Sequence, residues 1–438
     1  MKYDFDNVAA RYGTNSLKYD FVREKGKPDG VLPMWVADMD FQAPPEVLSD
    51  MQKAVSHGIF GYTEPKEEYY DSVTKWFESH FGYHVASEEI VKTPGVVFAL
   101  TQAVRAFTTP GDSVIIQTPV YYPFYDVIRE TGRKVVTNPL LSINGKYSID
   151  FMDFEKKVIE QSVKMFILCS PHNPVGRVWT REELVQLNEI CVTHGVTIVS
   201  DEIHCDFVWS GYTHTCFGLL NENAVIATAP SKTFNLPGLQ VSNIFVKNPD
   251  LRMKLKTEIT RSGYSQLNTL GLVACQSAYS KGAAWLNELK IYLADNIRLT
   301  KEFLELRLPL IKMTEIEGTY LVWLDFSGYG LSQEELDRRI TAGAKLWLSS
   351  GTIFGEDGKG FERVNIACPK TILLDALYRL ESEFLLKTYY TYYIIGCIEC
   401  KSGVLWSGSN NNTPKLQICE VDKHENFYKG QIRNPYAA

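Results

Sequence analysis

Four short apolar runs rich in β-branched residues lie between residues 113 and 229 of the chain. They begin at Ser113, Met165, Val196 and Asn223, and polar or aromatic side chains follow each of them. Runs of this length predict buried strands, as in the largely parallel sheet of an α/β protein. Because ligands bind beyond the strand ends of such sheets, we expect one crevice there. The side chains predicted to meet in it are Tyr121, Asn173, Asp201 and Lys232.

Helical periodicity separates these strands, and a different pattern follows near residue 285. Pro45 to about His57 and residues 283–308 have helical spacing, whereas 317–326 and 361–367 alternate like strands of a separate sheet. The predicted fold is α/β, with a large domain built on a mostly parallel sheet and a smaller α+β domain. The expected divisions are an N-terminal arm at 1–40, partly joined to the small domain, a large domain at 41–285, a small domain at 286–387 and an atypical tail at 388–438.

Composition and charge narrow the class of protein. Of 438 residues, 45% are hydrophobic, and the net charge of -7 combines both signs along the whole chain. The hydrophobic fraction allows a sizeable core. The charge distribution contains no basic patch of the kind that binds nucleic acid. No uncharged stretch is long enough to span a bilayer, and the first residues lack the pattern of a signal peptide. We therefore expect a cytoplasmic protein that binds neither nucleic acid nor membranes.

The cysteines do not predict a disulfide framework. There are nine, an odd number, and they are scattered, so reduced thiols in or near the core are expected. Cys397 and Cys400 form a CxxC pair, but neither a second pair nor nearby histidines accompany it. No metal site is predicted.

The most informative polar position is Lys232, between a hydroxyl residue and a turn at the end of the fourth run. Burying an ammonium group is costly, and a desolvated neutral lysine is the nucleophile that forms Schiff bases with carbonyl cofactors. Taken alone, a Ser-Lys-Thr triplet favours a surface lysine on a loop. The other strand ends, with their carboxylate, amide and phenol groups, reverse that interpretation.

Three motifs in this order carry a family resemblance. They are SPHNPVG at 170–176, SDEIH at 200–204 and SKTFNLPG at 231–238. Together they resemble the fold-type I pyridoxal-phosphate (PLP) enzymes of the class I/II aminotransferase family, over roughly residues 1–387. The resemblance implies a seven-stranded sheet, PLP as cofactor and a homodimer with composite active sites.

The resemblance also implies roles for individual residues. Lys232 would hold PLP as an imine and then act as the base, Tyr121 would stack on the ring or steer the leaving group, and Asp201 would pair with the pyridinium nitrogen. Asn173 would donate to the phenolic oxygen of the ring. The full cofactor-binding set that it implies is Gly95, Val96, Val97, Tyr121, Asn173, Asp201, His204, Ser231, Lys232 and, from the neighbouring subunit, Tyr62.

Two of these residues can also be explained as packed side chains without a role in binding. One further position carries a residue that differs from the one in the family. His204 stands where classical aspartate aminotransferases have a tyrosine, and it is equally typical of a core histidine. Tyr62 is also compatible with a packing role. Gln240 replaces an arginine that many aminotransferases use to clamp the phosphate, which weakens charge compensation there.

The segment WVADMDF at 35–41 resembles the cystathionine β-lyase, or carbon-sulfur lyase, branch of the family. In that branch it forms part of the substrate side of the pocket, which implies substrate contacts for Trp35, Ala37 and Asp38. Hydrophobic anchoring is the other reading of Trp35 and Phe41. The resemblance assigns the substrate carboxylate to Arg363, although an exposed charge would be unremarkable in its alternating strand.

Three functions follow from these readings. The leading one is a PLP-dependent β-lyase that cleaves L-cystathionine or related S-substituted cysteines to a thiol, pyruvate and ammonia. The second is an aminotransferase on the same scaffold, and the third is a regulatory or binding protein. WVADMDF and DEIH favour the lyase, whereas an intact set of Lys232, Asp201, Asn173 and Arg363 argues against an inactive scaffold.

Overall fold

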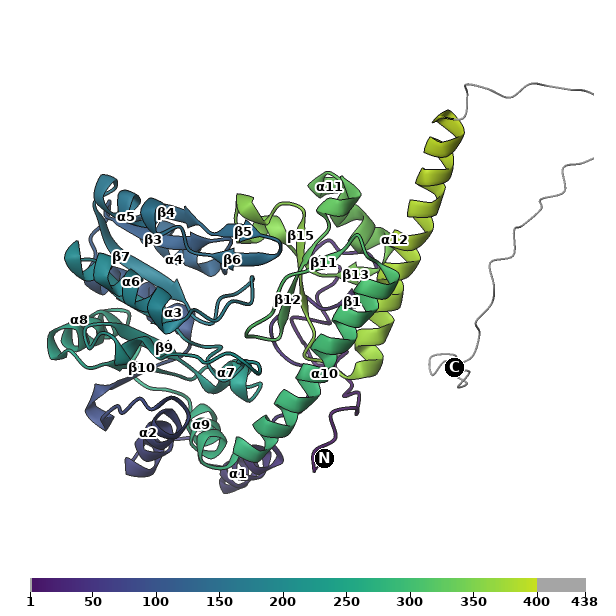
Figure 1. The fold of residues 1–438 in the computed structure, drawn as a ribbon. Helices are drawn as coiled ribbons and strands as arrows, with labels where there is room; N and C mark the ends of the chain where they lie inside the picture. Colours follow the sequence, from purple (N-terminus) through teal and green to yellow (C-terminus); the bar gives the residue numbers. More distant parts are fainter. Residues whose placement is uncertain (1, 400–438) are drawn as a thin grey trace, which may run out of the picture. The chain divides into compact units, whose positions relative to one another are not determined.

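The computed structural model describes residues 2–399, with side chains to Leu385. Residues up to Tyr389 form one compact unit that contains both predicted sheets. Figure 1 shows the larger sheet with its helices and the smaller sheet beside the long helix α10 (Ala283–Arg307).

The larger sheet has seven strands in the order β2-β10-β9-β8-β7-β3-β4. Strand β10 runs antiparallel to both of its neighbours, and the other pairs are parallel. The predicted mostly parallel sheet is therefore confirmed. Its strands are β2 (Ile90–Thr93), β3 (Ser113–Thr118), β4 (Lys134–Pro139), β7 (Val163–Cys169), β8 (Thr197–Asp201), β9 (Val225–Thr228) and β10 (Ser242–Val246).

Helices cover both faces of this sheet, because successive side chains of each strand point to opposite sides. On β3, Val114 and Ile116 belong to one apolar cluster and Ile115 to the other. The first cluster includes α3 (Val96–Phe107), α4 (Pro123–Arg129) and α8 (Pro249–Arg261). The second includes α1 (Pro45–His57), α2 (Glu67–Phe81), α5 (Phe151–Glu160), α6 (Arg181–Thr193), α9 (Thr269–Lys281) and the start of α10.

The smaller sheet has four antiparallel strands in the order β11-β12-β15-β14. They are β11 (Lys312–Met313), β12 (Leu321–Asp325), β14 (Ser349–Ser350) and β15 (Phe361–Asn365). Its apolar cluster joins Val322 and Val364 to residues of α10, α11 (Gln333–Arg338) and α12 (Lys370–Glu399). The N-terminal arm joins this region through β1 (Leu32–Pro33), which pairs with β13 (Leu346–Trp347). A separate hairpin consists of β5 (Leu141–Ile143) and β6 (Lys146–Ser148).

Two helices of this region need a closer description. Helix α11 ends at Arg338, and one π-helical turn, Arg339–Gly343, follows it directly. The tail expected from residue 388 begins inside α12. The CxxC pair at Cys397 and Cys400 lies outside the residues with described side chains. The division of the compact unit at residues 40 and 285 stays a prediction.

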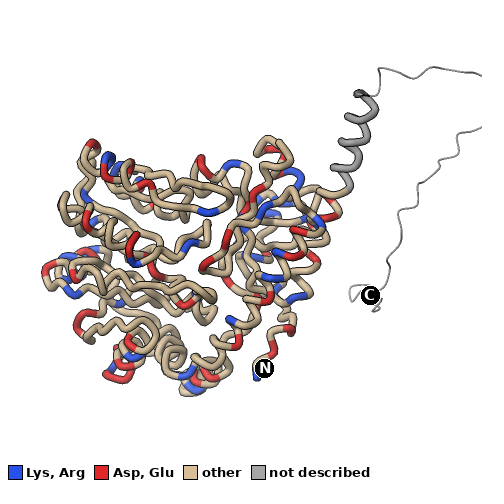
Figure 2. The backbone as a smooth tube through the Cα atoms, viewed as in Figure 1, with Lys and Arg blue, Asp and Glu red and all other residues tan. Residues whose placement is uncertain are grey.

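Lys and Arg are interspersed with Asp and Glu over the described part of the chain (Figure 2). In that part, no helix combines the length and the hydropathy needed to cross a bilayer. The described cysteines are buried free thiols, as predicted: Cys169, Cys191, Cys205, Cys216, Cys275 and Cys368.

Candidate active site

A cavity of about 270 Å³ lies beyond the ends of the central strands of the larger sheet. Most of the predicted site residues meet there. The lining residues are Ala37, Pro94, Gly95, Val96, Val97, Phe98, Tyr121, Cys169, Asn173, Asp201, Ile203, His204, Ser231, Lys232, Pro237, Gln240 and Val241.

Lys232 lies on α7 (Pro230–Thr233), a single turn that directly follows β9. Its Nζ donates a hydrogen bond to the carbonyl oxygen of Ala37 at 3.3 Å. Burial and the nearby charge of Arg363 lower the pKa of the Lys232 amine to about 8, against the opposing effect of Asp38 and Asp201. The lowered pKa increases the neutral fraction of this amine near neutral pH, and a nucleophile or base requires the neutral form.

Asp201 is the last residue of β8, and its carboxylate is buried. One oxygen accepts a hydrogen bond from the backbone N–H of Ile203 at 3.2 Å. Burial raises the pKa of this carboxyl to about 7, and Lys232 opposes that effect. In the described part of the chain no salt bridge compensates Asp201, so the cavity offers a buried acidic group to a cationic ligand atom.

His204 follows at the same strand end and is also buried. Burial, together with the charges of Lys232 and Arg363, holds the pKa of this imidazole well below its ordinary value. Among the described residues its Nδ1 has no hydrogen-bond partner. A neutral imidazole with a buried, unpaired ring nitrogen therefore lines the cavity, which differs from a satisfied core histidine.

Arg363 reaches this region from β15 of the smaller sheet. Its alternating strand suggested an unremarkable exposed charge, yet the residue is only 4% exposed. The guanidinium donates to Asn173 Oδ1 at 3.0 Å and to the Trp35 carbonyl at 2.8 Å, while its Nε has no partner among the described residues. Burial lowers the pKa of Arg363 to about 10, so it stays cationic at neutral pH.

The start of α3 lines the cavity and supplies backbone donors to it. Gly95 precedes this helix with φ 154°, and no side chain caps the first turn. The first N–H groups of a helix lack partners inside it and attract anions. Val96, Val97 and the hydroxyl residue Ser231 line the same cavity. Tyr121 closes another side, where its backbone N–H donates to the Asn173 carbonyl at 3.1 Å.

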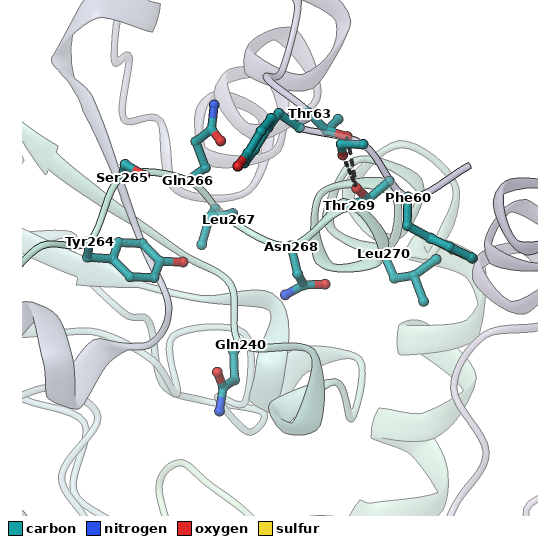
Figure 3. Close-up of a pocket in the computed structure, with 12 residues that line it drawn as sticks. Phe60, Thr63, Gln240, Tyr264, Ser265, Gln266, Leu267, Asn268, Thr269 and Leu270 are labelled. Atoms are coloured by element: carbon teal, nitrogen blue, oxygen red, sulfur yellow. Dashed lines mark hydrogen bonds between the residues drawn. The ribbon is translucent and has the colours of Figure 1, made fainter. Parts of the chain in front are cut away.

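Tyr62 does not line this cavity. Its side chain is 98% exposed, on a segment that lines a second cavity of about 810 Å³. Figure 3 shows that second cavity, where Thr63 and Thr269 are hydrogen-bonded at 2.8 Å. Gln240 lines both cavities, which are therefore neighbours.

The side chains of Trp35 and Asp38 are engaged outside the cavity. The Trp35 ring stacks on Trp347 with centroids 4.4 Å apart, and the Asp38 carboxylate forms an ion pair with Arg11. Ala37 contributes its carbonyl oxygen. This segment therefore contacts the site residues through its backbone.

Sequence reasoning missed several residues near the site, among them Cys169, Ile203 and Tyr320. Cys169 and Ile203 line the cavity because they end β7 and follow β8. The buried Tyr320 donates from its hydroxyl to the Ala37 carbonyl at 2.8 Å. Ile203 lies inside the SDEIH motif and Cys169 immediately precedes the SPHNPVG motif, whereas nothing in the local pattern around Tyr320 indicates a site residue.

This sheet order, with its cavity at the strand ends, is that of the fold-type I α/β enzymes, as predicted. The chain belongs to the aminotransferase class I and II family, whose profile matches residues 30–379.

Several relatives are similar over nearly their whole length. The cystathionine beta-lyase PatB of Bacillus subtilis (strain 168) is 45% identical over 383 residues, which cover 86% of this chain and 99% of that protein. The structure of cystalysin from Treponema denticola, described as containing pyridoxal 5'-phosphate, superposes with a TM-score of 0.85 at 39% identity and covers 89% of this chain and 100% of that one. A PLP-bound putative aminotransferase from Clostridium difficile 630 has a TM-score of 0.85 at 37% identity, with coverage of 87% and 100%.

Proposed function

We propose that this protein is a PLP-dependent carbon-sulfur β-lyase that cleaves L-cystathionine or related S-substituted cysteines. The observation that carries the proposal is the 45% identity to a cystathionine beta-lyase over 99% of that protein. Fold alone does not determine function, so the site chemistry must also fit.

The cavity residues fit PLP at each of its functional groups. The amine of Lys232 suits the aldehyde, and the buried Asp201 carboxylate, which has no salt bridge in the described part of the chain, suits a protonated ring nitrogen. Asn173 accepts from Arg363 through Oδ1, which leaves its amide NH₂ to donate to the phenolic oxygen. The start of α3 and Ser231 suit the phosphate. When bound, PLP supplies an electron-withdrawing ring that stabilises negative charge at the substrate Cα.

The side chains then have distinct tasks. Arg363 binds the substrate carboxylate through its planar guanidinium, and the neutral Lys232 amine removes the Cα proton. The electron pair of that C–H bond forms the Cα–Cβ double bond as the Cβ–S bond breaks, and the sulfur leaves as a thiolate. Water converts the released enamine to pyruvate and ammonia. A thiolate is a good leaving group, so elimination outruns the second proton transfer that transamination needs.

Product analysis tests this function directly. Purified protein with PLP and L-cystathionine should release pyruvate, ammonia and thiol in equal amounts without any added keto acid. The matched control is the carbon analogue of the substrate, with CH₂ in place of sulfur, which offers no leaving group and should yield no pyruvate.

The second candidate, an aminotransferase, is favoured by the similarity to the Clostridium difficile protein described as a putative aminotransferase. It predicts amino transfer to 2-oxoglutarate or pyruvate much faster than thiol release. That result would contradict the lyase proposal.

We also propose a homodimer in which Tyr62 completes the site of a second copy. A tyrosine that is 98% exposed, beside Ile59 at 70% and Phe60 at 61%, forms an apolar surface suited to burial. The cavity beside Tyr62 shares the lining residue Gln240 with the cavity that contains Lys232, so an interface at Tyr62 would lie next to the site. The reduced buried thiols support a cytoplasmic location.

Subunit mixing tests the composite site. Lys232→Ala and Tyr62→Ala variants should each have little activity, and equal amounts denatured and refolded together should regain roughly a quarter of wild-type activity, because half of the dimers are hybrids with one intact site. Sedimentation should show a dimer. An active monomer, or no recovery from a sample shown to contain hybrids, would contradict the proposal.

A further inference from the structure

The segment at residues 35–39 is held in an unusual way, because side chains bind each of its five consecutive backbone carbonyls. Loop carbonyls commonly face water instead. The donors and distances are Arg363 to Trp35 at 2.8 Å, Asn365 to Val36 at 2.6 Å, Tyr320 to Ala37 at 2.8 Å, Asn365 to Asp38 at 2.7 Å, and Arg11 and Asn235 to Met39 at 3.1 and 3.0 Å.

Ion pairs from the N-terminal arm also hold the side chains of this region. Arg11 pairs with both Asp38 and Asp40, and Lys18, which is 1% exposed, pairs with Asp40 at 2.8 Å. Partners from several distant segments therefore determine where the Ala37 carbonyl lies. These contacts restrain the Ala37 carbonyl more tightly than the carbonyl of an ordinary loop residue is restrained.

The Ala37 carbonyl is also the hydrogen-bond acceptor of Lys232, at 3.3 Å from Nζ. It thus has two donors, the Lys232 amine and the Tyr320 hydroxyl, one for each lone pair of the oxygen. Asn365 holds the carbonyls on both sides of it. Lysine has a flexible four-carbon stem, so a base on that stem needs an external contact to keep it in position.

We propose that the Ala37 carbonyl is the acceptor that holds the free Lys232 amine in the cavity, and that Tyr320 and Asn365 are positioning residues that keep this carbonyl in place. An amine that donates one hydrogen to Ala37 directs its nitrogen lone pair away from the carbonyl. The inference rests on the proposed function, in which the free amine of Lys232 is the base.

The ionisation of Lys232 reports on this contact, because a carbonyl acceptor stabilises the ammonium form more than the neutral amine. When the Tyr320 hydroxyl is removed, the Ala37 carbonyl oxygen no longer shares its lone pairs between two donors. Its hydrogen bond with the Lys232 amine then becomes stronger. Removing the Asn365 amide frees the Val36 carbonyl and leaves the Asp38 carbonyl only the long contact from Lys18 Nζ at 3.5 Å, so the acceptor between them moves away. The two changes should therefore shift the pKa of Lys232 in opposite directions. The charged and titratable groups that face Lys232 remain the same in both variants: Asp38, Asp201, His204 and Arg363.

The experiment measures the pH dependence of Lys232 acetylation in cofactor-free protein, by trace labelling with acetic anhydride and mass spectrometry of the Lys232 peptide. The wild-type midpoint is expected at about 8. In Tyr320→Phe it should rise by about half a unit to one unit, as expected for a hydrogen bond to a charged group that is no longer shared. In Asn365→Leu it should fall.

The matched control is Tyr69→Phe. Tyr69 is 1% exposed and donates to Asn243 at 2.8 Å, so the same chemical change occurs at a buried phenol away from residues 35–39. Its Lys232 midpoint should equal the wild-type value. An unchanged or lowered midpoint in folded Tyr320→Phe overturns the inference, and this variant alone decides if Asn365→Leu does not fold. Failure of the proposed function is separately visible, as wild-type protein that binds PLP at Lys232 but releases no pyruvate.

Discussion

Lys232→Ala is expected to leave a folded protein that forms no covalent bond with PLP and whose kcat/KM for β-elimination is lower by at least about 10⁴. The amine supplies both the covalent attachment and the base, so one substitution removes two functions. The fold should survive, because Lys232 lies on a short turn and its hydrogen bond to Ala37 is one of two that this carbonyl accepts.

The measurements are visible absorbance, borohydride reduction followed by mass spectrometry, and pyruvate release. The control is Lys301→Ala, because Lys301 is an exposed lysine of α10 whose only described partner is Glu305 at 4.0 Å. That variant should behave as wild type. Borohydride-stable PLP that remains attached to the Lys232→Ala protein would show that another lysine carries the cofactor.

Arg363→Ala is the second change with a large expected effect. Loss of a buried charged partner costs about 2–5 kcal/mol, which corresponds to a kcat/KM lower by roughly 30-fold to 4,000-fold, mainly through a higher KM. Arg363→Lys should recover part of this loss, because it keeps the charge and loses the planar two-pronged donor.

A substrate without a carboxylate separates binding from structural damage. An S-substituted cysteamine lacks the group that Arg363 is expected to bind, so wild type and Arg363→Ala should process it at similar low rates. A second control, Arg338→Ala, removes an exposed arginine that pairs with Glu335 on the same helical turn, and it should leave KM unchanged. An equal loss with both substrates would mean that Arg363 acts only through its contacts with Asn173 and Trp35.

The larger sheet was predictable because burial on both faces demands continuous apolar runs, and such runs are visible in a single sequence. The same reasoning predicted the meeting of Tyr121, Asn173, Asp201 and Lys232, since parallel strands end at one edge. Helix α1 was predicted with its observed bounds, because Pro45 begins it and Gly58 ends it with φ 75°.

The position of Arg363 was not predictable from its own strand. An alternating pattern places every second residue on one face, but it does not say whether that face meets water or another part of the chain. Here the face meets Asn173 and the carbonyl of Trp35, so a charge that looked ordinary is buried. Its expected role came only from the family resemblance.

Local pattern by itself determined the apolar strands, the main helices and the lysine at a strand end, because each depends on neighbours within a few residues. Tertiary structure alone decided which groups from outside the strand ends contact that lysine or hold its contact in place. The carbonyl of Ala37, the hydroxyl of Tyr320 and the ion pairs of Arg11 and Lys18 come from segments far apart in sequence. Hydrogen bonds and ion pairs act only at short range, so folding must first bring these groups together before their contacts can shape the site.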